Sequence, residues 1–262
     1  MNFKRIDPIR FLVVIWTHCL AAYFLYTFQW WYLIPFIVMN LIFNTTITVF
    51  LHKSLGHRVW HYKSKVIDHF FALMTQLHFM GHPWGWAIMH RFHHKYLDTE
   101  LDPHSPAQVG HIVSYFHLWK MPVPNRGISK YIDMKDLLKD YKHLLIYSKY
   151  PMAFTVAIWA FVGLLFGLEG LAIVGAASCF QHHSLGIIDC IVHRTPKIIH
   201  SPSKWLTGIM MGPPEGIEHL EHHAQPYVHS HIKGWFDYHA RIIEILEKKG
   251  LVEIKGKKIL DV

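Results

Sequence analysis

Two long stretches with almost no charge limit what this chain can fold into. Residues 11–51 contain no Lys, Arg, Asp or Glu, and residues 151–193 contain only Glu169 and Asp189 as ionised groups. A membrane-spanning helix needs about 20 apolar residues, and each stretch is just over forty residues long. The sequence therefore predicts four transmembrane helices, paired as two hairpins, over about 11–51 and 152–193.

The basic residues predict which side of the membrane the remaining chain occupies. All 26 Lys and Arg lie in the first ten residues, between the two hairpins, or after His193. The expected turns, near Thr27 to Trp30 and Gly167 to Gly170, carry none. Because basic loops stay in the cytoplasm, we expect both termini and a cap of residues 52–150 and 194–262 on the cytoplasmic side.

Composition supports a single membrane-embedded domain over residues 1–262. The chain is 52% hydrophobic and only 17% charged, which differs from an average soluble protein. Its net charge of +8 suits an anionic membrane surface. No basic stripe stands clear of the apolar segments, so nucleic acid is not an expected partner. Three cysteines are too few for a disulfide framework. The expected fold class is an all-α integral membrane protein with a helical cytoplasmic cap.

Histidine motifs are the chemical feature of the cap. HRFHH and HLEHH place histidines at positions i, i+3 and i+4, which share one face of a helix. We therefore expect each motif to aim three imidazoles at one point. An HxxxxH motif directly follows the first apolar stretch. These motifs contain His52, His57, His90, His93, His94, His219, His222 and His223.

The last expected span carries more polarity than a lipid-facing helix tolerates. At 100° per residue, His182, Asp189 and His193 fall within about 40° of one another, whereas His183 lies over 100° from Asp189. Ionisable groups inside a membrane usually face a bundle interior or a functional cavity. We therefore assign His182, Asp189 and His193 to the active face. His183 is left off this face, and His18 is interpreted as a helix contact because no other histidine accompanies it.

A polar stripe in the second expected span leads to the first histidine motif. Asn40, Asn44, Thr48 and His52 are spaced by four residues. This stripe is equally compatible with hydrogen bonds between helices and with the lining of a substrate channel. We take Asn44, Thr48 and His182 as candidate tunnel residues.

The patterned histidines predict a centre with two metal ions. Nine imidazoles, the eight in the motifs and His193, are too many for one ion but give each of two ions four or five nitrogens. Imidazole suits iron, zinc, copper and nickel alike, so spacing alone does not identify the metal. Iron is preferred because no hydrolytic nucleophile accompanies the motifs.

These motifs resemble those of the membrane fatty acid desaturases, specifically the Δ9-type branch of acyl-CoA and acyl-lipid enzymes. The similarity runs from HKSLGH through HRFHHKYLDTELDPHSP to EGIEHLEHHAQP. It implies two irons held by the nine histidines, with O2 and two electrons used to insert a cis double bond into a saturated acyl chain. It also implies a separate electron donor, ferredoxin or cytochrome b5, because no fused donor motif is present in the sequence.

Two positions depart from the resembled pattern. The family commonly has Asn four residues before its third-region histidine, where this chain has Asp189. Asp189 is therefore a candidate metal ligand, directly or through water. Acyl-CoA enzymes carry a charged pair before HRxHH, where this chain has Ile88 and Met89. That difference favours an acyl chain on a lipid over an acyl thioester.

Two other functions remain open at this point. A fatty acyl or lipid hydroxylase uses the same scaffold, and the product depends on substrate placement to within about an ångström. A membrane metal transporter also places histidines in spans, but its ligands lie near the bilayer midplane. The double-bond position, the chain length, the acyl carrier and the oligomeric state are left open.

Overall fold

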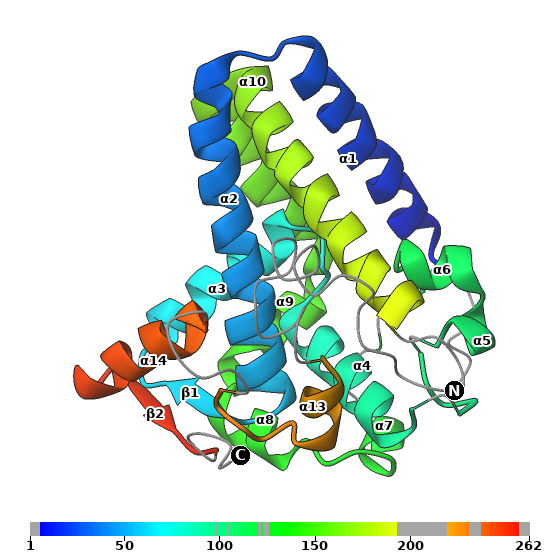
Figure 1. Ribbon diagram of the computed structural model, residues 1–262, viewed down its shortest axis with the longest axis vertical. Coiled ribbons are helices and arrows are strands. Elements are labelled where there is room, and N and C mark those ends of the chain that lie inside the picture. Colours follow the sequence, from blue (N-terminus) through cyan, green and yellow to red (C-terminus); the bar gives the residue numbers. More distant parts are fainter. Residues whose placement is uncertain are drawn as a thin grey trace.

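The structure is a computed structural model, and it describes residues 6–97, 99–103, 105–119, 122, 126–192, 219–230 and 237–256. Long helices stand together at one end, and shorter helices with a small sheet gather at the other (Figure 1). The helices of the first half are α1 (Pro8–Tyr26), η1 (Trp30–Tyr32), α2 (Leu33–Thr45), η2 (Thr46–Gly56), α3 (Lys65–Leu77) and α4 (Pro83–Lys95).

The second half adds one long helix and several short ones. The short helices before it are α5 (Pro106–Val109), α6 (His111–Tyr115), α7 (Arg126–Ser129), α8 (Lys135–Asp140), η3 (Lys142–Leu144) and α9 (Leu145–Lys149). The others are α10 (Pro151–Ile187), η4 (Ile188–Val192), α13 (His219–Ala224) and α14 (Tyr238–Lys248). Strands β1 (Trp60–Tyr62) and β2 (Val252–Ile254) pair antiparallel. The expectation of an all-α chain is wrong in this one detail.

The first hairpin forms as its sequence predicts. Asp7 caps α1 by accepting a hydrogen bond from the Ile9 backbone N–H at 3.0 Å, and Pro8 occupies the first turn. The chain turns after Tyr26 and returns as α2, and aromatic packing of Phe24 against Phe36 closes the turn at 5.4 Å between ring centroids. Both α1 and α2 pack along α10 (Figure 1).

The second apolar stretch reverses direction at Gly167. This residue has φ of +62°, outside the helical range, in the middle of α10. Trp159 and Val162 before the turn pack in one cluster with Val174 and Ala177 after it. The halves of α10 therefore lie side by side (Figure 1). The predicted turn near Gly167 is confirmed.

The long helices expose apolar side chains on their outer faces. Leu25 is 71% exposed, Ile34 71% and Leu164 87%. Within the described part of the chain, three helical segments are long and apolar enough to cross a membrane, namely Pro8–Tyr26, Trp30–Gly56 and Pro151–Cys190. The third candidate includes the reversal at Gly167. Such continuous apolar surfaces are typical of helices in lipid.

Candidate metal centre

A π-helix brings His52 and His57 onto one face. In an α-helix, residues five positions apart point in different directions, whereas the π-helix closes i to i+5 hydrogen bonds. η2 is such a helix, and the His57 N–H donates to the His52 carbonyl at 2.9 Å. The two Nε2 atoms consequently lie 3.2 Å apart. The unusual helix type explains how an HxxxxH spacing serves one site.

Helix α4 delivers the HRFHH motif beside η2. His82 caps α4 by accepting the Gly85 N–H at 2.9 Å, and Pro83 follows in the first turn. The Nε2 of His90 lies 2.8 Å from that of His57. Trp86 stacks on the His90 ring, with 4.9 Å between centroids. On another side, a Cβ added to Gly56 would lie 3.0 Å from His90 Cδ2.

Helix α13 completes a group of five imidazoles. The Nε2 of His222 lies 2.8 Å from that of His52 and 3.3 Å from that of His94. Ligand atoms of all five members lie within 4.8 Å of one another. We call this set the five-imidazole cluster: His52, His57, His90, His94 and His222.

His93 and His223 form a second group beside the first. Their ring centroids are 5.1 Å apart, and His223 also stacks on His94 at 4.2 Å. His93 Nδ1 donates to the Asp102 carboxylate, with distances of 3.0 and 3.1 Å to its two oxygens. The described histidines of HRFHH and of HLEHH therefore divide between two groups, which differs from the expectation that each of these motifs aims at one point.

Asp102 is a candidate site residue that the sequence reasoning did not single out. It is 1% exposed, and it lies in the DPH loop that follows the second motif. A carboxylate on the far nitrogen of a ligating imidazole fixes its tautomer and its orientation. The buried Asp102–His93 pair has this arrangement, so the acidic loop was the available signal.

The side chains of two of the nine predicted ligands, His193 and His219, lie outside the described part of the chain. His219 opens α13, but its side chain lies outside the described part of the chain, and all of His193 does. Their metal ligation stays a prediction.

Asp189 lies on η4, apart from the five-imidazole cluster. One carboxylate oxygen accepts a hydrogen bond from His117 Nε2 at 2.8 Å. The His117 ring is 6.3 Å from that of His182, whose Nδ1 donates to the Ser178 carbonyl at 2.8 Å. Asp189 and His182 thus lie near a shared neighbour, His117, which the sequence reasoning did not single out.

The candidate tunnel residues Asn44 and Thr48 are buried, at 4% and 0% exposure. Asn44 Oδ1 accepts a hydrogen bond from the Tyr238 hydroxyl on α14 at 3.2 Å. Among the described residues, Thr48 Oγ1 and Asn44 Nδ2 have no hydrogen-bond partner. In the same stripe, Asn40 Oδ1 accepts a hydrogen bond from Gln181 Nε2 on α10 at 3.1 Å. The side-chain oxygens of Asn40 and Asn44 thus make helix contacts, and Asn44 Nδ2 and Thr48 Oγ1 are left for a tunnel lining.

Burial favours the neutral form of three imidazoles in the cluster. Desolvation lowers the pKa of His57, His94 and His222 well below the ordinary 6.5, and the neighbouring imidazoles lower it further. A neutral imidazole offers a lone pair, which metal binding requires. The donor set therefore fits a metal ion bound by nitrogen.

Basic residues inside the motifs hold the groups together. Arg91 donates to both carboxylate oxygens of Asp136, at 2.9 and 2.6 Å, and to the Gly56 carbonyl at 3.0 Å. Lys53 is buried, and it donates to the His229 carbonyl at 3.0 Å, just beyond α13. Through these hydrogen bonds, basic residues of the motifs connect elements that are distant in sequence.

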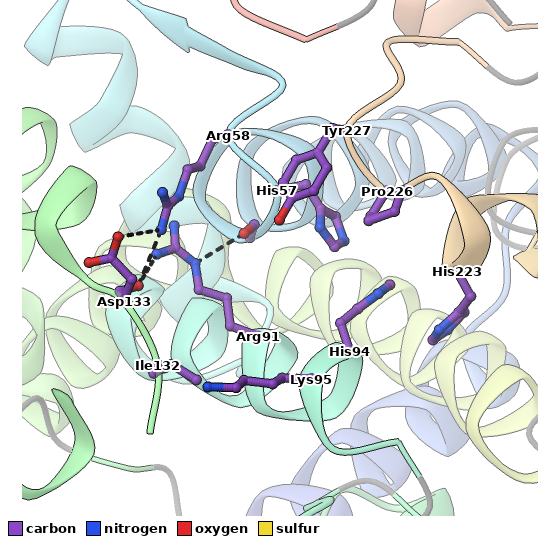
Figure 2. Close-up of a pocket in the computed structure, with 11 residues that line it drawn as sticks. His57, Arg58, Arg91, His94, Lys95, Ile132, Asp133, His223, Pro226 and Tyr227 are labelled. Atoms are coloured by element: carbon purple, nitrogen blue, oxygen red, sulfur yellow. Dashed lines mark hydrogen bonds and ion pairs between the residues drawn. The ribbon is translucent and has the colours of Figure 1, made fainter. Parts of the chain in front are cut away.

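A surface pocket of about 430 Å³ opens onto the imidazoles. Figure 2 shows His57, His94 and His223 on one side of it and Arg58 and Arg91 on the other. The pocket gives both imidazole groups a common route to solvent.

Long apolar helices together with a buried group of five imidazoles define a chain suited to a membrane and to binding a metal ion. No family model matches the chain. It is 29% identical over 252 residues to acyl-CoA 5-desaturase AL21 of Anemone leveillei, covering 89% of this chain and 74% of that protein. It is 28% identical over 269 residues to the acyl-CoA C20 Delta5-desaturase of the same plant, covering 95% and 82%.

A third relative is named for a different acyl carrier and a different double-bond position. Delta-9 acyl-lipid desaturase 1 of Arabidopsis thaliana is 27% identical over 195 residues, covering 73% of this chain and 63% of that protein. The resemblance in the histidine motifs is thereby confirmed: the chain is related over most of its length to the acyl-CoA and acyl-lipid desaturases.

Proposed function

We propose that this protein is a membrane fatty acyl desaturase that inserts a cis double bond into a saturated acyl chain. The observation that carries the proposal is the convergence of five imidazoles within 4.8 Å beneath long apolar helices. The names of the relatives support the same class of reaction.

In this proposal, each of the two imidazole groups binds one iron. The five-imidazole cluster holds one iron, and His93 and His223, together with His193 and His219, hold the second, with Asp189 beside it. When bound, the two irons supply the oxidising power, drawn from O2 and two electrons, that breaking unactivated C–H bonds requires. Asp102 orients His93, and burial keeps His57, His94 and His222 neutral.

The membrane arrangement belongs to the same proposal. The two halves of α10 act as separate spans, which gives four spans with α1 and α2. The histidine-bearing cap and both termini face the cytoplasm, where a separate electron donor such as ferredoxin or cytochrome b5 delivers electrons.

An acyl chain on a membrane lipid is the preferred substrate. The residues before HRFHH that replace the charged pair, Ile88 and Met89, are 0% and 1% exposed. They offer a polar thioester carrier no surface to bind, whereas a lipid substrate already lies beside the apolar helices.

Lipid analysis tests the proposed reaction. The chain would be expressed in a host lacking the activity, and fatty-acid methyl esters would be separated and identified by mass spectrometry. We expect a new monounsaturated product, lost in His222→Ala and kept in His61→Gln, since His61 contacts Glu253 in the sheet at 3.5 Å instead. A new hydroxyl group would favour the hydroxylase, and an unchanged lipid profile would contradict both enzymes.

The acyl chain is proposed to lie alongside Asn44, Thr48 and His182. Thr48→Trp would fill this space, so we expect shorter accepted chains or a shifted double bond, whereas the near-isosteric Thr48→Val should keep the wild-type products. Both variants would be compared at equal amounts of membrane-inserted protein. Identical product profiles would favour a helix-contact role for the stripe.

A further inference from the structure

A second cluster of metal-binding side chains lies between α1 and α10. The sequence reasoning left His18 without a histidine partner and set His183 apart from the active face, yet their Nε2 atoms lie 3.1 Å apart. Cys179 is buried on α10, one turn before His183. The ligand atoms of these three residues lie within 4.8 Å of one another.

The far nitrogens of both rings are occupied by oxygen partners. His18 Nδ1 donates to the Val14 carbonyl at 2.7 Å, and His183 Nδ1 lies 2.9 Å from the Tyr115 hydroxyl. A ligating imidazole usually has such an oxygen on its other nitrogen, which fixes the tautomer and the direction of the free lone pair. Here the two Nε2 atoms are directed at each other.

The spacing suits a shared ion. Two imidazole nitrogens bound to one zinc or copper ion at about 2.0 Å are about 3.3 to 3.5 Å apart. The Nε2 atoms of His18 and His183, which are 3.1 Å apart, would have to separate only slightly to bind one ion. Their separation also falls within the 2.8 to 3.3 Å found between Nε2 atoms of the five-imidazole cluster.

A hydrogen bond between the two imidazole rings would explain why His18 and His183 are close. It would not explain why the Cys179 thiol lies beside them. We propose that His18, Cys179 and His183 form a separate site for one thiophilic metal ion, with Cu(I) as its preferred occupant. Thiolate ligands select copper(I) and zinc. Cu(I) with one thiolate carries no net charge, which suits an apolar span better than the net positive charge of zinc.

Binding requires defined proton movements. The Cys179 thiol loses its proton to solvent as the sulfur–metal bond forms. The proton shared between the two Nε2 atoms moves to His183 Nδ1, where the Tyr115 hydroxyl accepts it as a hydrogen bond.

The proposed ion would join three elements. Tyr115 ends α6, which lies beside the start of α1 and the last turns of α10 (Figure 1). Coordination would fix α1 to the part of α10 that leads into η4 and Asp189.

Cobalt(II) is the probe for this site, because a thiolate ligand gives cobalt a charge-transfer absorption that imidazole ligands do not. The full-length protein, purified in detergent, would be titrated with Co²⁺. The patterned histidine motifs contain no cysteine, so iron binding there and thiolate binding here are separately visible. We expect one equivalent of thiolate-bound cobalt in the wild type, in Cys19→Ser and in Cys190→Ser.

The variants within the site should behave differently. Cys179→Ser should lose the charge-transfer band, and His18→Gln and His183→Gln should weaken cobalt binding at least tenfold. Absence of the band from the wild type, or its survival in Cys179→Ser, would overturn the site. Displacement of cobalt by Cu(I) at lower concentration than by Zn²⁺ is expected, and the reverse order would overturn the assignment to copper.

Discussion

Neighbouring histidines in this chain serve different groups. His94 joins the five-imidazole cluster, while His93 turns its Nδ1 to Asp102 and lies beside His223. The residue types and their spacing were readable from the sequence. The division was not, because it depends on where the Asp102 loop folds back. The partnership of His18 with His183 was also missed, since 165 residues separate them.

A residue-scale prediction concerns Asp189, which is held by His117 at 2.8 Å. If its carboxylate also serves the second metal, Asp189→Leu should lower the iron content of the protein from two towards one per chain. Asp189→Asn, which retains an oxygen acceptor, should keep both irons and much of the activity. Two irons in the purified Leu variant would exclude Asp189 from the site.

At the scale of elements, helix type decides what a motif does. An α-helical reading predicts that α13 and α4 present histidines on one face, and both motifs do lie on helices. An α-helix would not place His52 and His57 on one face, whereas the π-helix η2 does. The sequence reasoning assumed α-helical periodicity throughout and therefore missed η2, although the five-residue spacing of the HxxxxH motif was the available signal. Helix α14 begins after Asp237, whose side chain caps it by accepting a hydrogen bond from the Ala240 N–H.

The end of η2 yields an element-scale prediction. In Gly56→Ala, the new methyl group would press on His90, which is stacked against Trp86 on another side. Overpacking of this kind costs about 1–3 kcal/mol, so we expect iron affinity to fall about tenfold or more in a chelator competition. Gly163→Ala is the matched control, because its methyl group would meet only the flexible Leu171 side chain. Equal affinity in wild type and Gly56→Ala would contradict this packing.

At the scale of the whole molecule, the apolar stretches predicted the long helices. The cytoplasmic side assigned to the cap from the charge pattern stays a prediction. Both hairpin turns lie where the sequence places them. The small sheet pairs β1 with β2 across most of the chain, and His52 meets His222 across 170 residues. Contacts at such separations depend on the packed fold and not on local pattern, which is why they were not predicted.

Buried histidines predict how the stability of the whole protein depends on pH. Burial lowers the pKa of His82 to about 4, and those of His57, His94 and His222 lie well below 6.5. The unfolded chain therefore binds more protons below pH 6.5, and the free energy of unfolding falls as pH drops.

For His82 alone the loss is roughly 3 kcal/mol at pH 4. We expect the Tm of the metal-free protein to be nearly constant above pH 7 and to fall from pH 6.5 towards pH 4. His82→Asn, which can still cap α4, should show a shallower fall. A Tm that rises on acidification would contradict the burial of these groups.

The division of the imidazoles into two groups predicts two irons per chain, and the iron content of the purified protein measures this number. Full-length protein would be loaded anaerobically with Fe²⁺, freed of excess metal and analysed for iron and protein together, with His61→Gln as the control. We predict two irons in the wild type and the control, and about one in both His222→Ala and His93→Ala. One iron in the wild type, or two in both variants, would contradict the account.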